Sequence, residues 1–258
     1  MLFEEERKRE IADYIQQKGR ASVLELAQYF QVSESTVRRD LRDLEDTKLL
    51  RRTHGGAVSI GIQDNREPSF IEKEDRFSSQ KEAVAEAALN FIEDGESIFL
   101  DSGTTTYKLA KRLHAFSRLT VVTNSVMVVQ ILHHQPNINL LLTGGSLRHE
   151  TQAMVGPLAD RSIGSVKFDK LFLAINGIEP GSGLTTPNLI EAETKRRMIE
   201  SAKQVILLAD HSKYGKVSFG KVADLTEIHH CIIDQGISAD AVREMEAEGI
   251  QVTIAKDR

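Results

Sequence analysis

The sequence predicts an α/β protein in two parts: a small helical domain with a β-hairpin, then a larger domain with a largely parallel sheet. Residues 1–58 show helical periodicity interrupted by short turns, and they end in a Gly-Gly hairpin pattern. Residues 59–79 are polar and irregular, as expected of a linker. From residue 80 to 258, short apolar strands alternate with helices, which is typical of a parallel sheet covered on both faces.

The composition is that of an ordinary globular protein, with 40% hydrophobic and 28% charged residues. No apolar run is long enough to cross a bilayer, and the acidic N-terminus is unlike a secretory signal. The single cysteine, Cys231, excludes an intrachain disulfide and lies in an apolar run, so we expect a buried core thiol. These features predict a cytoplasmic protein with no membrane partner.

The net charge of −5 argues at first against a nucleic-acid partner, because DNA attracts cationic surfaces. Residues 1–58, however, carry eleven Lys or Arg and eleven Asp or Glu, which leaves 22 basic and 27 acidic residues beyond them. The acidic excess therefore belongs to the larger domain. What matters for DNA is whether the basic residues of the small domain share one face.

The first two helices of the small domain follow from apolar spacing and capping residues. Residues 2–17 form the first, with an inward stripe of Ile11, Tyr14 and Ile15, and Gly19 ends it. Ser22 is placed to cap the second, which we expect over residues 23–30. The residues of this second helix expected to face inward are Leu24, Ala27 and either Tyr29 or Phe30.

A third helix, from the Ser33 cap to about Lys48, has two chemically different faces. At 100° per residue its inward stripe consists of Val37, Leu41 and Leu44. The opposite face carries hydroxyl and guanidinium groups, which suit phosphates and guanine edges in a major groove. Asp40 and Asp43 lie away from the centre of that face. An ordinary solvated charged face is the alternative, and only the neighbouring elements decide between the two.

Those neighbours are a helix and tight turn of the size found in a helix-turn-helix, and a basic hairpin over residues 49–58. A short strand, a Gly-Gly turn and a second strand form a wing whose basic residues are available to the sugar-phosphate backbone. His54 has no companion at metal-ligand spacing. The candidate DNA contacts of this winged helix-turn-helix are Ser33, Ser35, Thr36, Arg38, Arg39, Arg42, Arg51, Arg52 and His54.

The segments Ser-Glu-Ser-Thr-Val-Arg-Arg-Asp-Leu from Ser33 and Arg-Thr-His-Gly-Gly-Ala from Arg52 resemble the signature of DeoR-type bacterial repressors. Both occur at the family's spacing, and the resemblance extends through nearly the whole chain. It implies a regulator that binds double-stranded operator DNA.

In the larger domain we expect strands at residues 96–100, 119–123, 138–143, 170–174, 205–209, 231–234 and 251–254. Helices are expected at 83–92, 107–113 and 126–133, and a short one at 72–76 within the linker. In such sheets ligands bind beyond the carboxyl ends of the strands. The sequence places polar or Gly-rich segments there, beginning with Asp101-Ser-Gly-Thr-Thr-Thr, whose amides and hydroxyls can surround a phosphate.

Four more strands end in similar segments: Thr123-Asn-Ser, Thr143-Gly-Gly-Ser, Asn176-Gly and Ala209-Asp-His-Ser-Lys. Each alone is equally consistent with a helix cap. Five polar strand ends in one sheet predict a shared site for a small polyhydroxylated anion, with Lys213 and Arg148 as candidates for its charge partners. We expect no cofactor and no metal, because no nucleotide-binding glycine pattern is present and the histidine pairs 133–134 and 229–230 make poor chelates.

The segments 101–106, 183–188, 191–195 and 209–213 resemble the effector domain of DeoR-type regulators, which is similar to ribose-5-phosphate isomerase. The resemblance implies a phosphorylated sugar or related metabolite as ligand. The candidate effector-binding residues are Asp101, Ser102, Gly103, Thr104, Thr105, Thr106, Thr123, Asn124, Ser125, Gly144, Gly145, Arg148, Asn176, Gly177, Glu193 and Lys213.

A sugar-phosphate isomerase fused to a DNA-binding module is the rival interpretation. Isomerisation needs a base and an acid, but Ala174 and Gly177 stand where isomerases of the similar fold carry carboxylates. We therefore expect no enzyme and no catalytic residue. A DNA-architectural protein would not need a large acidic α/β domain. The sequence and the resemblance together predict a homo-oligomeric repressor, dimer or tetramer, of a carbohydrate-catabolism operon, relieved by a phosphorylated sugar.

Overall fold

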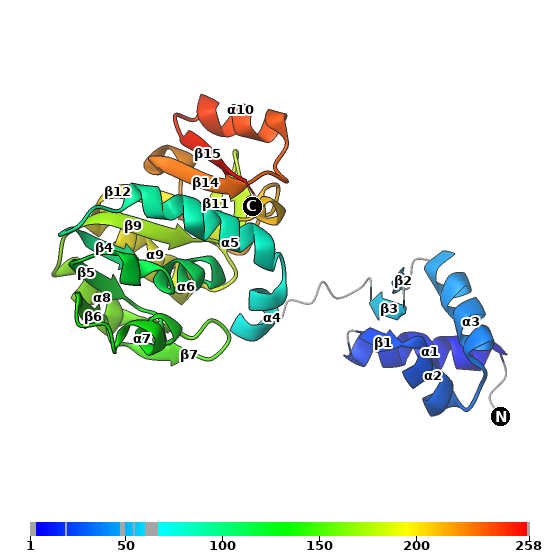
Figure 1. Ribbon diagram of the computed structural model, residues 1–258. Helices are drawn as coiled ribbons and strands as arrows, with labels where there is room; N and C mark the ends of the chain where they lie inside the picture. Colours follow the sequence, from blue (N-terminus) through cyan, green and yellow to red (C-terminus); the bar gives the residue numbers. More distant parts are fainter. Residues whose placement is uncertain (1–3, 19, 47–49, 54, 60–66, 257–258) are drawn as a thin grey trace. The chain divides into compact units, whose positions relative to one another are not determined.

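The computed structural model describes residues 4–18, 20–46, 50–53, 55–59 and 67–256. They form two compact units that divide between Glu67 and Pro68 (Figure 1). Among the described residues, no helix is long and apolar enough to cross a membrane.

The N-terminal unit packs three helices on a small antiparallel sheet. The helices are α1 (Glu4–Lys18), α2 (Val23–Phe30) and α3 (Glu34–Asp46). The strands β1 (Arg20–Ser22), β2 (Leu50–Thr53) and β3 (Gly56–Ser59) pair in the order β1-β3-β2. The predicted helices and the hairpin are thus confirmed, while β1 was not expected. The result is a winged helix-turn-helix.

The inward face of α2 differs from the prediction. The Ser22 side chain accepts a hydrogen bond from the Glu25 amide, as expected of a cap, so the helix begins at Val23. Its buried residues are Val23, Leu26 and Ala27, spaced i, i+3 and i+4. Leu24 and Tyr29 are instead 56% and 63% exposed, because one residue along the helix is a rotation of about 100°.

The C-terminal unit is built on a seven-stranded, entirely parallel sheet in the order β15-β14-β12-β9-β4-β5-β6. Its strands are β4 (Ser97–Leu100), β5 (Leu119–Thr123), β6 (Ile138–Leu142), β9 (Phe168–Ala174), β12 (Ala202–Ala209), β14 (His230–Asp234) and β15 (Gln251–Ala255). All seven were predicted within a few residues. The core strands alternate between two apolar layers: Ile98 and Leu100 face one, and Phe99 faces the other.

Helices cover both faces of this sheet (Figure 1). The first layer contains α5 (Ser78–Ala88), α6 (Thr104–Ala110) and α7 (Val126–Leu132). The second contains α8 (Pro157–Gly164), α9 (Leu189–Ser201) and α10 (Ala239–Ala247). A small sheet of β10 (Gly177–Glu179), β11 (Gly183–Thr186) and β13 (Gly220–Ala223) packs in the second layer. A hairpin of β7 (Ser146–Arg148) and β8 (Ala153–Val155) completes the unit. The predicted α/β class with a largely parallel sheet is confirmed.

The C-terminal unit begins earlier than the sequence suggests. Residues 68–79, expected in the linker, contain α4 (Phe70–Asp75) and the first residues of α5. Phe70 is 4% exposed, its ring lies 5.4 Å from that of Tyr107, and its amide donates to the Glu150 carbonyl. Burial of this aromatic ring fixes α4 on the C-terminal unit.

Candidate functional site

The predicted DNA-binding face of α3 is exposed. Ser33 and Ser35, and the three arginines Arg38, Arg39 and Arg42, are exposed, while Thr36 is half-buried. Ser33 Oγ lies 2.7 Å from Ser35 Oγ and 2.9 Å from Thr36 Oγ1, and it accepts from the Thr36 amide. Hydroxyls and guanidinium groups therefore share one solvent-facing side of the helix.

Two of the three aspartates of α3, Asp40 and Asp43, pair with basic residues of α1. Asp40 is 1% exposed and accepts from Arg7 Nε at 2.7 Å and from Arg7 Nη2 at 3.1 Å. Asp43 pairs with Lys8 at 2.8 Å, and this hydrogen bond lowers the pKa of Asp43. Asp40 and Asp43 are therefore neutralised within the unit, whereas Glu34 of α3 pairs with the exposed Arg38 at 3.2 Å.

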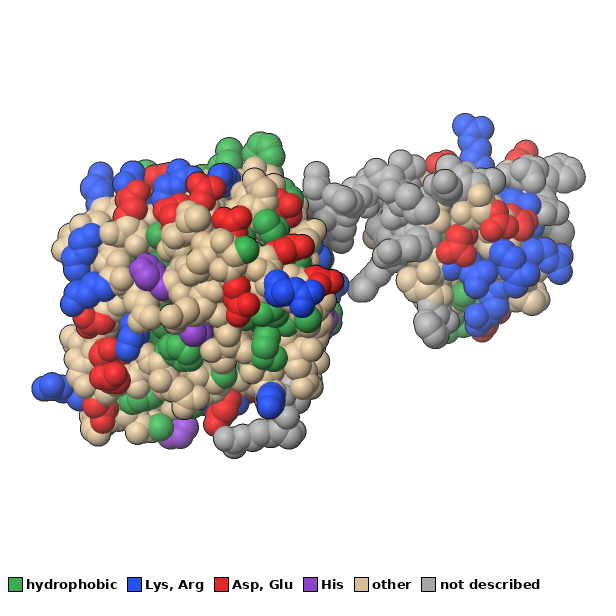
Figure 2. Space-filling model, turned by 90° about the horizontal axis from the view of Figure 1, so that it is seen from above, with side chains coloured by type: hydrophobic (Ala, Val, Ile, Leu, Met, Phe, Trp, Pro, Cys, Tyr) green, Lys and Arg blue, Asp and Glu red, His purple; other side chains and the backbone are tan. Residues whose placement is uncertain are grey.

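The wing and α3 together line a groove. Arg38 and Arg42 of α3 and Arg52 of the wing lie along it, and Figure 2 shows Lys and Arg side chains gathered on one face of this unit. The Arg52 guanidinium is 3.7 Å from the Glu45 carboxylate, which also accepts from the Arg52 amide. The side chain of Arg51 and all of His54, both predicted contacts, lie outside the described residues.

A cavity of about 280 Å³ lies in the C-terminal unit, where β4, β9 and β12 end. These three strands are neighbours in the sheet, so the loops that follow them meet. Of the predicted residues, the cavity is lined by Ser102, Gly103, Thr104, Thr105, Asn176 and Lys213. The Thr104 and Thr105 side chains have no hydrogen-bond partner within the described part of the chain.

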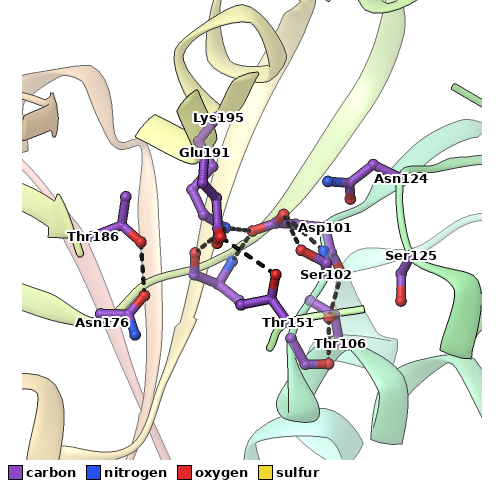
Figure 3. A network of polar contacts seen from close by, with 12 residues as sticks. Asp101, Ser102, Thr106, Asn124, Ser125, Thr151, Asn176, Thr186, Glu191 and Lys195 are labelled. Atoms are coloured by element: carbon purple, nitrogen blue, oxygen red, sulfur yellow. Dashed lines mark hydrogen bonds and ion pairs between the residues drawn. The ribbon is translucent and has the colours of Figure 1, made fainter. Parts of the chain in front are cut away.

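Asp101 lies beneath this cavity in a buried ion pair. The Lys195 ammonium is 2.5 Å from Asp101 Oδ2 and donates to the Ala174 carbonyl at 3.0 Å. Lys195 also lies 3.6 Å from Glu191, and both come from α9 and point toward Asp101 (Figure 3). Asp101 Oδ2 accepts from the Ala174 amide as well. Contacts within the protein thus occupy the Asp101 carboxylate. Its ion-pair partner is Lys195, which was not among the predicted site residues.

Arg148, predicted to supply charge to the ligand, is paired with Glu191 instead. Glu191 lies 43 residues further along the chain, so the sequence alone carries no sign of this pairing, and Arg148 also lies 3.6 Å from Glu150. Glu193 also lies away from the cavity lining, on the exposed side of α9, where it pairs with Arg196 at 3.3 Å and Arg197 at 3.0 Å.

Other predicted residues bond to the backbone or pack closely. Thr106 Oγ1 donates to the Asp101 carbonyl at 2.6 Å, Thr123 Oγ1 donates to the Leu100 carbonyl at 2.7 Å, and Ser125 Oγ caps α7. Asn124 donates to the Met154 carbonyl; among the described buried side-chain nitrogens and oxygens, only its Oδ1 has no partner. None of these four side chains lines the cavity.

Two of the three predicted glycines outside the lining, Gly145 and Gly177, serve close backbone approaches. A Cβ at Gly145 would lie 2.7 Å from the Val155 carbonyl oxygen, and Gly145 has φ +118°. A Cβ at Gly177 would lie 2.3 Å from the Lys216 carbonyl oxygen. Gly144 has φ +67°, which favours glycine.

Sequence reasoning missed most of the cations in the cavity. Lys73 and Arg76 come from α4 and its end, Lys81 from α5, and Lys216 from the segment after β12. Lys81 Nζ donates to the carbonyl oxygens of Lys73 and Arg76, and burial lowers its pKa to about 8. Burial also lowers the pKa of Lys213. Among the described residues, no three His, Cys, Asp or Glu side chains are grouped as a metal site requires.

Known proteins match both units. A model described as "DeoR-like helix-turn-helix domain" matches residues 7–63, and "DeoR C terminal sensor domain" matches residues 76–235. The "HTH-type transcriptional regulator GlpR" of Haloferax volcanii is 40% identical over 247 residues, 96% of each chain. The "Putative aga operon transcriptional repressor" of Escherichia coli O157:H7 is 34% identical over 250 residues, 96% of this chain and 93% of that protein.

The chain belongs to the DeoR family.

Membership of the DeoR family confirms the resemblance found in the sequence. The chain is therefore a transcriptional regulator with a helix-turn-helix domain and a sensor domain. The relatives are regulators and not enzymes, which disfavours the isomerase interpretation. Among solved structures, ribose-5-phosphate isomerase A from Methanocaldococcus jannaschii matches 52% of this chain and 53% of that chain, with 16% identity and a TM-score of 0.38. A structural similarity with so low an identity and TM-score is no evidence of a shared function.

Proposed function

We propose that this DeoR regulator represses a carbohydrate-catabolism operon and is relieved by a phosphorylated sugar bound in the C-terminal cavity. The observation that carries the proposal is the cavity itself, where hydroxyl-bearing Ser102, Thr104 and Thr105 face a wall of lysines and arginine. Relatives whose names state their targets point the same way: one is an aga operon repressor and another a lactose phosphotransferase system repressor.

DNA recognition is assigned to the exposed face of α3 and to the wing. Arg39 and Arg42 are the proposed base readers, while the hydroxyls near the start of α3 and Arg52 take phosphates. The helix is held in place from behind by the bidentate Arg7–Asp40 pair. We further propose a homo-oligomer, dimer or tetramer, because a small domain without net positive charge needs a second half-site for tight binding. Exposed apolar side chains such as Leu189, Ile190 and Phe219 are candidates for the contact between copies.

Ligand control is assigned to α4. This helix is the first of the C-terminal unit, and Phe70, Lys73 and Arg76 all line the cavity. A ligand that contacts this wall favours one placement of α4 over another. It changes DNA affinity only if it binds the two states with different affinities.

The isomerase alternative requires an acid and a base that are both available to a sugar. Among the described residues, the carboxylates that line the cavity are Glu191, paired with Arg148 and Lys195, and Asp210, which accepts from the Ser212 amide and lies 3.9 Å from Lys213. Neither is placed to move a proton between neighbouring carbons of a sugar.

Two substitutions separate the proposed functions. Arg42→Ala should cost about 1–3 kcal/mol of discrimination between operator and unrelated DNA if the Arg42 side chain reads a base.

Thr105→Ala should leave DNA binding intact and weaken the response of DNA binding to sugar phosphates. Both are measured by fluorescence anisotropy on the full chain, with Lys18→Ala as an exposed control on α1. Unchanged discrimination in Arg42→Ala removes it from the reading face, and turnover of a pentose or hexose phosphate by the protein contradicts the assignment as a regulator.

A further inference from the structure

One side of the C-terminal unit exposes a group of large apolar side chains, which we call the apolar face. Phe219 is 81% exposed, and the other four members are each more than half exposed. The members are Leu158 at the start of α8, Leu189 and Ile190 at the start of α9, and Val217 and Phe219 just before β13. Apolar side chains gathered in this way mark a surface that meets a partner.

The apolar face is continuous, because its three chain segments pack together. A Cβ added to Gly156, just before α8, would lie 3.8 Å from Ile190 Cγ2, and Leu158 follows in the first turn of α8. A Cβ added to Gly220, the first residue of β13, would lie 3.4 Å from Leu189 Cδ2. The face therefore runs from α8 across the start of α9 to the start of β13.

The apolar face is large enough to form the centre of a dimer interface. Its five side chains expose roughly 400 Å² of apolar surface, given the area that aliphatic and aromatic side chains of this size bury. A stable interface buries about 800 Å² on each partner, and about 65% of a homodimer interface is apolar. The face therefore supplies most of the apolar area that one copy contributes to a homodimer.

The border of the apolar face carries both signs of charge. One turn beyond its apolar residues, the outward side of α9 carries two acidic and two basic residues, Glu193, Arg196, Arg197 and Glu200. In a twofold pair each copy presents the same surface to the other, so a border of one sign would repel itself. A border of mixed sign can meet its own copy, whereas a nucleic-acid partner requires a basic one.

The edge of the small sheet beside the apolar face is already covered by Arg196. The outer strand of that sheet is β13. Arg196 Nε donates to the Val222 carbonyl at 3.2 Å, and Arg196 Nη2 donates to the Lys221 carbonyl at 3.0 Å. These bonds favour a partner that contacts the face through side chains over one that adds a strand to the edge.

The apolar face also borders the ligand cavity. Lys216 and Ser218 line the cavity and alternate along the chain with the exposed Val217 and Phe219. Pro187 lines the cavity as well, two residues before the start of α9. A partner on the apolar face therefore lies beside loops that line the cavity.

We propose that a second copy of this chain docks on the apolar face, with each copy using the same surface about a twofold axis. Two observations select this partner: the apolar area suits the centre of a homodimer interface, and the mixed-charge border can face its own copy. The inference rests on the proposed function, since it locates the contact of the proposed homo-oligomer. It places that contact at the rim of the effector cavity.

Sedimentation velocity of the full chain at about 0.15 M salt, over a series of protein concentrations, tests the proposal. Wild type should sediment as a dimer or a larger even-numbered assembly. Phe219→Asp and Ile190→Asp should each weaken association on the order of a hundred-fold or more, because twofold symmetry places the unpaired charge in the interface twice. Leu142→Asp makes the same change at a 43% exposed position of the edge strand β6, and it should associate like wild type.

Phe219→Ala keeps the test valid if an aspartate variant fails to fold, which circular dichroism reports. This variant removes the aromatic side chain without adding a charge. It should weaken association on the order of ten-fold, as truncation of an aromatic side chain at the centre of an interface does.

Three outcomes overturn the proposal. A wild type that sediments as a monomer at every concentration leaves the apolar face to another occupant and removes the proposed homo-oligomer as well. Folded Phe219 and Ile190 variants that associate like wild type place the contact between copies elsewhere, and the proposed repressor function stands. If Leu142→Asp weakens association as much as Phe219→Asp does, the loss reflects added charge and not the apolar face.

Discussion

Lys195 shows how a single residue organises the ligand cavity from below. Its side chain is 2% exposed and that of Asp101 is not exposed at all, and two such charges remain buried only when each is paired and hydrogen-bonded. The pair joins α9 to the ends of β4 and β9 through Asp101 and the Ala174 carbonyl. Ion pairs within the protein therefore hold the floor of the cavity, which the hydroxyl-bearing Ser102, Thr104 and Thr105 also line.

Replacing Lys195 by Met should destabilise the C-terminal unit by about 3–5 kcal/mol, because Asp101 stays buried without its partner. The double variant Lys195→Met with Asp101→Asn should recover most of this loss. Urea-induced unfolding followed by circular dichroism measures both. A loss below about 1 kcal/mol in the single variant would mean that the pair is not buried in solution.

A second residue-scale prediction concerns the pH dependence of stability. Burial lowers the pKa of Lys81 from its ordinary 10.5 to about 8. Between these two values the unfolded chain binds more protons at this site than the folded chain, so stability rises as pH increases from about 8 to about 10.5. The comparison of wild type with Lys81→Met isolates this contribution from that of other groups. An identical pH profile for the two proteins contradicts it.

The sequence predicted the loops that line the cavity more accurately than the individual side chains that line it. The polar ends of β4, β9 and β12 do form the cavity, whereas Thr123 and Ser125 at the end of β5 bond to the backbone. Strand-end spacing does not reveal whether a hydroxyl faces the ligand or a neighbouring carbonyl. The cations of α4 escaped prediction because the residues around them were assigned to the linker.

At the scale of elements, capping signals proved more informative than apolar counts. Ser22 fixes the start of α2, and that start determines which residues face inward. The sequence Ser69-Phe-Ile-Glu72 forms a full capping box on α4, with both reciprocal hydrogen bonds present. This signal could have placed α4 in the folded domain. By contrast, β10, β11 and β13 are three or four residues long, and such short strands leave little periodicity to detect.

Ser22→Ala should destabilise the N-terminal unit by about 1 kcal/mol, because the Glu25 amide loses its acceptor at the first turn of α2. Ser22→Thr keeps the hydroxyl acceptor and should lose much less. Thermal unfolding of the two variants checks the difference. Equal stability of wild type and Ser22→Ala would show that the side chain contributes no cap.

At the scale of the whole molecule, the two units divide the chemistry between them. The N-terminal unit presents arginines and hydroxyls on α3 with Asp40 and Asp43 paired to α1, and the C-terminal unit encloses a cationic cavity beside α4. Net charge alone would have argued against a DNA partner, but the distribution of charge within each unit supports one. The α4 helix lines this cavity and begins two residues after the first residue of the C-terminal unit, Pro68.

The most direct test of ligand-controlled DNA binding is the affinity of the full chain for DNA upstream of its own operon, measured with and without sugar phosphates. Fluorescence anisotropy should show tight, sequence-dependent binding that at least one sugar phosphate weakens by on the order of ten-fold, which corresponds to a coupling free energy of about 1.4 kcal/mol. Thr105→Ala should bind the same DNA and respond less. Operator affinity that no sugar phosphate changes, in wild type as in Thr105→Ala, would contradict the account.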